Sequence, residues 1–161
     1  MFQIAALMIM AAAKPVAPVK SPVFGQWQTK EEQGHRSVYT INDSLSLFGF
    51  VCAKEGCVYV VQMGNCVEGK GYGLLMASTT AGGTVPAACL DFAGRPTFFV
   101  DPEAIESLID GSEIAFAWPI ENTGFKVSKF SLEGARKAVA WVTDQRARSG
   151  ATGDASKHNA P

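Results

Sequence analysis

The sequence predicts a mainly β domain, a β-sandwich-like arrangement of antiparallel sheets with two short α-helices and stabilising disulfide bonds. Three observations favour this fold. Residues 44–63 contain two apolar runs, rich in aromatic and β-branched residues, on either side of a short polar segment, which is typical of a β-hairpin. The 161 residues include 16 glycines and 8 prolines, as expected of short strands joined by turns. The chain also has 4 cysteines, enough for two disulfide bonds.

Residues 1–13 are predicted to be a signal peptide. Residues 2–13 form an uncharged apolar run that ends in three alanines, as at a signal-peptidase cleavage site. The run is shorter than the roughly 20 apolar residues that span a membrane, so we expect no membrane span. An apolar first strand is the alternative, because only the amino group of Met1 supplies positive charge before the run. The three prolines of residues 14–23 favour an extended leader. We therefore expect an exported protein, either periplasmic or secreted.

The folded domain is expected to occupy residues 24–143, with Trp27 as its first core residue. Residues 81–86 are expected to form a loop. Strands are expected at residues 37–41, in both arms of the 44–63 hairpin, and at residues 72–79, 96–100, 113–118 and 125–130. Residues 144–161 have almost no apolar side chains and are predicted to be a disordered tail.

Two helices are predicted near the end of the domain. Asp101 suits an N-cap, Pro102 suits the first helical position, and Gly111 follows the expected last turn. Ser131 is expected to cap the final helix, and Gly134 within it suggests close packing, because glycine weakens a helix by about 1 kcal/mol relative to alanine. The apolar stripe of the final helix comprises Leu132, Ala135, Val139 and Val142.

The cysteines at Cys52, Cys57, Cys66 and Cys89 are predicted to form disulfide bonds, because an even number behind a signal peptide favours oxidation. Three pairings are possible. If the register of the 44–63 hairpin is symmetric, Cys52 lies opposite Cys57, which leaves Cys66 to pair with Cys89. A zinc site is the alternative, but the chain has no Cys-x-x-Cys pair and its two histidines lie elsewhere. We therefore expect no metal.

The sequence shows no set of residues that specifies a reaction. A serine or cysteine nucleophile needs a neighbouring base, and the two histidines are His35, in a polar segment, and His158, in the predicted tail. The glycine-rich residues 69–73 precede an expected strand rather than a helix, so a phosphate-binding loop is not expected. A net charge of −1 gives no basic footprint for nucleic acid. We expect no catalytic residue and no cofactor.

Residues 101–142 resemble the C-terminal half of the invasion-associated locus B family of exported bacterial proteins. The shared pattern is a short helix closed by glycine, a strand, a turn, a strand that ends in Ser-Leu-x-Gly, and an alanine-rich helix. In this sequence the pattern comprises Gly111, residues 114–118, the tetrapeptide Ser131, Leu132, Glu133 and Gly134, and residues 135–142. Cys89 roughly matches a cysteine that the family carries before the first helix, although the glycine-cysteine pair that accompanies it in the family is missing here. Trp27 lacks the nearby cysteine of that family, and the N-terminal half is more similar to other small periplasmic β-sandwich proteins, including type VI secretion accessory proteins.

The resemblance implies an exported β-sandwich-like domain and transfers no catalytic residue to this chain. We therefore expect a non-enzymatic cell-envelope binding or accessory protein that acts on a protein partner, and the resemblance extends this expectation to association with a host. A periplasmic inhibitor or immunity-type protein that blocks an envelope hydrolase is the first alternative. An enzyme whose site the sequence does not reveal is the second.

Overall fold

The computed structural model describes residues 21–32, 35–53, 55–120 and 124–154, and for residues 145–154 it describes the main chain. The predicted signal peptide at 1–13, most of the leader at 14–23, and the end of the tail lie outside these residues, so those expectations stay predictions. In chain order the elements are β1 (Val23–Phe24), β2 (Trp27–Glu32), β3 (His35–Ile41), β4 (Leu47–Cys52), β5 (Cys57–Gln62), β6 (Gly71–Ser78), β7 (Gly82–Phe92), β8 (Arg95–Val100), α1 (Pro102–Ile105), β9 (Glu113–Ile120), β10 (Gly124–Ser131) and α2 (Ala135–Asp154).

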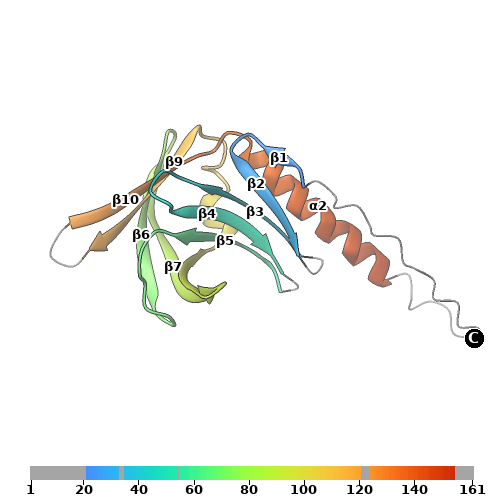
Figure 1. Cartoon of the computed structure of the whole chain (residues 1–161), viewed down its shortest axis with the longest axis horizontal. Coiled ribbons are helices and arrows are strands. Elements are labelled where there is room, and N and C mark those ends of the chain that lie inside the picture. The colour runs from blue at the N-terminus through green and yellow to red at the C-terminus, as the bar shows by residue number, and fades with distance from the viewer. Residues whose placement is uncertain (1–20, 33–34, 54, 121–123, 155–161) are drawn as a thin grey trace, which may run out of the picture.

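The strands of the described residues form one antiparallel sheet with the order β1-β2-β3-β4-β5-β8-β7-β6-β9-β10. The sheet curls, so that β2 to β5 face β9 and β10 across the core (Figure 1). The predicted mainly β, antiparallel fold is therefore confirmed. The facing layers belong to one continuous sheet, because β8, β7 and β6 connect the two halves without a break.

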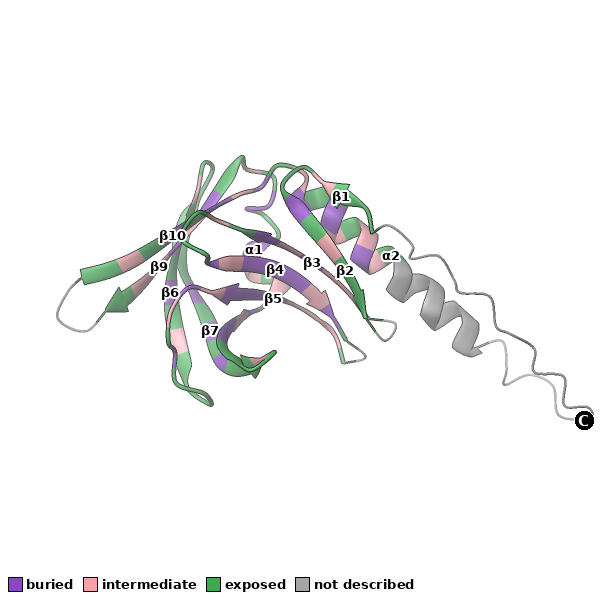
Figure 2. Ribbon diagram, in the orientation of Figure 1, coloured by how far each residue is buried: buried purple, intermediate pink, exposed green. Residues whose placement is uncertain are grey.

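Phe48 lies at the centre of the core. Its ring centroid is 5.5 Å from that of Trp27, 5.3 Å from that of Phe116 and 5.7 Å from that of Phe130. These rings come from β2, β4, β9 and β10, so one aromatic cluster joins both ends of the sheet order. Trp27, Phe48 and Phe116 are fully buried, as expected for the residues that close the core. Figure 2 shows that buried positions are concentrated on β4 and β5, in the middle of the sheet. Aromatic pairs at such distances add to the stability that burial gives.

Both predicted disulfide bonds are present. Cys52 and Cys57 are paired in the register of β4 and β5, with their Cα atoms 4.0 Å apart, so the symmetric hairpin is confirmed. Cys66 and Cys89 form the second bond, with Cα atoms 5.9 Å apart, and both are buried. This bond links the segment after β5 to the middle of β7.

The expected loop at residues 81–86 is wrong, because most of it belongs to β7. Gly82 to Pro86 pair with β6, in a register that places Gly82 opposite Ala77 and Pro86 opposite Gly73. On its other side, β7 pairs with β8 only from Ala87 onward. Within the described part of the chain, one side of this glycine- and proline-rich stretch is therefore unpaired, and a proline is tolerated at such an edge because it has no N–H to donate.

The N-terminal cap of the first helix is confirmed, since the Asp101 side chain accepts a hydrogen bond of 2.9 Å from the Glu103 N–H. The prediction that this helix continues to Gly111 is wrong, because α1 ends at Ile105 and turns follow it. The prediction that Ser131 caps the last helix is wrong. Ser131 is the last residue of β10, its hydroxyl accepts from the Glu133 N–H, and the helix begins at Ala135. Gly134 precedes the helix with a φ of 84°, a left-handed conformation that glycine adopts readily.

Helix α2 is longer than predicted. It continues to Asp154, so residues 144–154 of the expected disordered tail are helical. The low apolar content of this stretch correctly indicates that it has little to bury, but it contains no proline, and its alanine, arginine and glutamine residues have high helix propensity. On α2, Ala135, Ala138 and Val142 are buried and Val139 is half-buried, and Leu132 is buried just before the helix begins.

Candidate functional site

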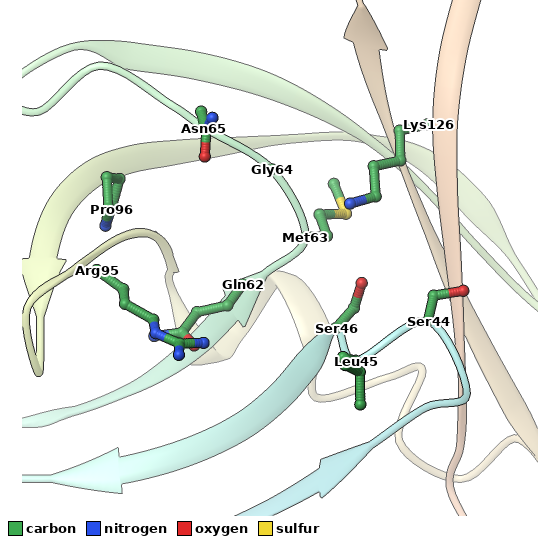
Figure 3. Close-up of a pocket in the computed structure, with 10 residues that line it drawn as sticks. All are labelled: Ser44, Leu45, Ser46, Gln62, Met63, Gly64, Asn65, Arg95, Pro96 and Lys126. Carbon is green, nitrogen blue, oxygen red and sulfur yellow. The ribbon is translucent and has the colours of Figure 1, made fainter.

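A pocket of about 400 Å³ opens where four segments meet at one end of the curled sheet (Figure 3). The segments are the turn between β3 and β4, the end of β5 with the link that follows it, the start of β8, and β10. The lining residues are Ser44, Leu45, Ser46, Gln62, Met63, Gly64, Asn65, Arg95, Pro96 and Lys126. This volume lies within the range of small-ligand sites.

The turn before β4 is held in one conformation by Asn42. The Asn42 side-chain oxygen accepts hydrogen bonds from the N–H of Ser44 at 3.1 Å and of Ser46 at 2.9 Å. The Asn42 side-chain amide donates to the main-chain oxygen of Lys129, 3.1 Å away on β10. Asparagine suits this place because its short amide can imitate a main-chain group in a turn. The turn is thus fixed to the strand that forms the opposite wall of the pocket.

Leu45 lies at the tip of this turn in an unfavourable conformation. Its φ is 57°, in the left-handed region, where a residue with a side chain costs about 1–2 kcal/mol relative to the right-handed form. Its N–H donates to the main-chain oxygen of Asn42 at 2.9 Å, and its residue surface is 83% exposed. Strained residues that the surrounding structure over-determines are frequent at functional sites. The main chain at Leu45 is therefore held by the turn, and the residue presents an exposed apolar side chain at the edge of the pocket.

Part of the pocket is lined by buried or hydrogen-bonded side chains. Met63 and Ser46 are buried, and the Ser46 hydroxyl lies 2.9 Å from the hydroxyl of Ser128 on β10. The Gln62 side-chain amide donates to Thr97 Oγ1 at 2.9 Å. The Ser46 hydroxyl and the Gln62 amide already have hydrogen-bond partners within the fold, so their role is to shape the pocket. The charged side chains of the lining are the groups available to a ligand.

Two cations face the pocket. Figure 3 shows Arg95 and Lys126 extending toward the same hollow from opposite sides. Neither side chain takes part in an ion pair or hydrogen bond among the described residues, and none of the lining residues is acidic. Lys126 is half-buried on the same side of β10 as the buried Ser128 and Phe130. The arrangement is suited to an anion, because both Arg and Lys donate charge-assisted hydrogen bonds.

The predicted cysteines lie outside the pocket lining and have a structural role in its support. Cys66 directly follows Asn65, so the bond to Cys89 fixes the link that carries Gly64 and Asn65 along one wall. His35 is exposed at the start of β3. Across the described ranges, no group of three or more His, Cys, Asp or Glu side chains is placed to hold a metal ion. Among the helices of the described part of the chain, none has the length and apolar character to cross a membrane.

Sequence reasoning missed Leu45, Arg95 and Lys126. One signal for Lys126 was present: in the strand expected at 125–130, alternation places residue 126 on the same side as the apolar Phe130. A lysine on the core side of a strand is unusual unless it has a partner or a function. No comparable signal marked Arg95, which lies just before the strand expected at residues 96–100.

Comparison with known proteins indicates a shared fold. No protein-family model matches the sequence, and no curated protein matches it. Among solved structures, the chain is similar to invasion associated protein B from Bartonella henselae, with a TM-score of 0.58 and 12% sequence identity over 80% of this chain and 99% of that one. At this identity the likeness establishes the fold alone. It agrees with the family resemblance of residues 101–142 and amounts to a distant structural relationship.

Proposed function

We propose that this protein is a non-enzymatic, exported binding protein of the bacterial cell envelope, and that it contacts a protein partner through the turn of residues 42–46. The observation that carries the proposal is Leu45. A large apolar side chain that is 83% exposed, in a strained conformation held by Asn42, has no role in the core. An exposed apolar side chain on a turn whose main chain is held next to a pocket suits a partner-binding surface, since pre-organisation lowers the entropic cost of binding.

Export is supported by the cysteines and by the N-terminal sequence. Two disulfide bonds form from all four cysteines, and such bonds persist in oxidising compartments such as the periplasm. The apolar run of residues 2–13 provides the signal, with a mature N-terminus expected near Lys14. The expected results are a periplasmic or secreted protein that begins near Lys14, measured by mass spectrometry, and no free thiol. A cytosolic protein with intact Met1 and four reactive thiols would contradict export.

The name of the structural neighbour, an invasion associated protein, supports a partner connected with a host. The same turn also supports the alternative of an inhibitor or immunity-type protein. A rigid loop that projects a leucine is suited to enter the cleft of an envelope hydrolase, as pre-organised inhibitor loops do. The two functions differ in the identity of the partner, and one cross-linking experiment distinguishes them.

The experiment places a photo-cross-linking amino acid at position 45 and, as a matched control, at position 75. Leu75 is also an exposed leucine, 43% accessible, but it lies on the outer side of β6. We expect a cross-link to an envelope or host protein from position 45, competed by excess unlabelled protein, and none from position 75. Capture of a hydrolase that the purified domain inhibits would favour the inhibitor. No competed cross-link from position 45 would contradict a binding role for this turn.

A further inference from the structure

We infer that the pocket binds the carboxylate of an acidic peptide segment, with Arg95 and Lys126 holding the carboxylate and Leu45 contacting a neighbouring apolar side chain. This inference rests on the proposed partner-binding function and names the chemistry that the partner presents. Its starting point is the pair of cations that face one hollow (Figure 3).

The charges of the pocket favour an anion. Arg95 and Lys126 line it together with uncharged residues, and none of the four ion pairs found among the described residues involves either of them. By contrast, Lys129, three residues later on the outer side of β10, pairs with Glu113 at 3.4 Å. Among the described residues, Lys126 is therefore the lysine of β10 without a carboxylate partner, and it is half-buried, where an unpaired charge is unfavourable. A ligand carboxylate would supply the missing partner.

The shape and apolar parts of the pocket favour a peptide. The guanidinium of arginine matches the two oxygens of a carboxylate, while a lysine adds a point charge from the other side. Beside these cations lie Leu45, which is exposed, Pro96, and the buried Met63. A peptide that carries an acidic residue next to an apolar residue would satisfy both halves of the pocket. Nucleic acid needs a wider basic footprint than two cations, and the chain has a net charge of −1.

A purely structural role for Lys126 is the competing explanation. β10 is the last strand of the sheet order, and an inward-pointing charge on an edge strand discourages edge-to-edge association. This explanation accounts for Lys126 but not for Arg95, which begins β8 between β5 and β7. The two explanations predict different behaviour of the charge-removing variants.

The test is an NMR titration of the ¹⁵N-labelled domain with three probes: acetyl-Glu-Leu-amide, its neutral match acetyl-Gln-Leu-amide, and inorganic phosphate. We expect saturable shifts of the amides of residues 44–46, 64–65 and 95 with the acidic peptide, and binding at least about tenfold weaker for the neutral peptide, from the loss of charge-assisted hydrogen bonds. Arg95→Gln and Lys126→Gln should each weaken the binding of the acidic peptide, and added salt should also weaken it. Lys129→Gln removes an equal charge from the same strand and should leave the affinity unchanged.

The other outcomes overturn the inference. Equal binding of the two peptides would show that the cations take no part. Phosphate binding as tightly as the acidic peptide would indicate a general anion site. Self-association of Lys126→Gln on size-exclusion chromatography, with unchanged peptide affinity, would leave Lys126 with the edge-protecting role. A failed titration alongside a competed cross-link from position 45 would refute this inference and leave the proposed binding function in place.

Discussion

The indole Nε1 of Trp27 donates a hydrogen bond to the main-chain oxygen of Ser131, 3.2 Å away and 104 residues later in the chain. Trp27 lies in β2 and Ser131 ends β10, so the bond joins strands from opposite ends of the sheet order. Trp27 is fully buried, and its ring packs edge-on against Phe48. The curled sheet is thus closed by a bond that gives a buried N–H its partner.

We expect Trp27→Phe to lower the free energy of unfolding by about 2–3 kcal/mol. The change leaves the Ser131 oxygen without its donor and opens a small cavity beside Phe48, and both effects destabilise. Urea unfolding measures the loss. The matched control is Trp141→Phe. Trp141 is half-buried on α2, and its ring centroid lies 4.2 Å from the Arg36 guanidinium carbon. The phenylalanine of the variant keeps an aromatic ring at this position. The control should lose less than about 1 kcal/mol; equal losses would contradict the role of the Trp27 bond.

The two disulfide bonds should contribute unequally. In the chain-entropy view, the bond between Cys66 and Cys89, with a separation of 23 residues, contributes about 3 kcal/mol, and the bond between Cys52 and Cys57, with a separation of 5, about 2 kcal/mol. Cys89 is also fully buried, whereas Cys57 is half-buried. We therefore expect the Cys66→Ala/Cys89→Ala double variant to have a lower melting temperature than the Cys52→Ala/Cys57→Ala double variant. The reverse order would show that the hairpin bond dominates.

Tyr59 should make the domain sensitive to alkaline pH. Burial raises the pKa of its hydroxyl above the ordinary value of about 10, and the charge of Glu106 acts in the same direction. The unfolded chain ionises this tyrosine above about pH 10 while the folded chain keeps it protonated, so its stabilising effect is complete below that pH and is lost as pH rises. We expect Tyr59→Phe to flatten the fall in unfolding free energy above pH 10 by up to about 1.4 kcal/mol per pH unit. Parallel curves for the parent and the variant would contradict this.

The sequence was most informative where the deciding contacts are local. The pairing of Cys52 with Cys57 followed from the symmetry of one hairpin, and the Asp101 cap from adjacent residues. The expected loop at 81–86 is wrong because pairing with β6, rather than the local glycines and proline, decides the conformation of this stretch. Strand propensity depends on context in this way.

The pocket could not be predicted from the sequence, because it also depends on contacts between distant segments. Leu45, Arg95 and Lys126 come from a turn, from the start of β8 and from β10, and only the curl of the sheet brings them together. The conformation of Leu45 depends on the hydrogen bonds that Asn42 accepts in this turn, and the Asn42 side chain in turn donates to the main-chain oxygen of Lys129 on β10. No pattern within a single segment contains this information.

Gly134 and Gly25 pack against each other's neighbouring main chain, and this contact should make Gly134 unusually sensitive to substitution. A Cβ at Gly134 would overlap the main-chain oxygen of Phe24, and a Cβ at Gly25 would overlap that of Glu133. Both glycines also have positive φ values, 84° and 59°. The tight approach brings β1 against the residues that lead into α2. We expect Gly134→Ala to destabilise through steric overlap in addition to the cost of the left-handed conformation.

Gly69 separates these two effects. Its φ of 78° is close to that of Gly134, but a Cβ there would meet nothing within 4 Å. Gly69→Ala should therefore cost about 1–2 kcal/mol, the left-handed penalty alone. Gly134→Ala should cost at least about 2 kcal/mol more, because main-chain atoms of β1 would have to move and the core beneath α2 would lose contacts. Thermal unfolding of the two variants and the parent measures the difference. Equal losses of stability in the two variants would mean that β1 can shift to make room for a Cβ at position 134. The contact between Gly134 and Phe24 would then not determine the position of α2.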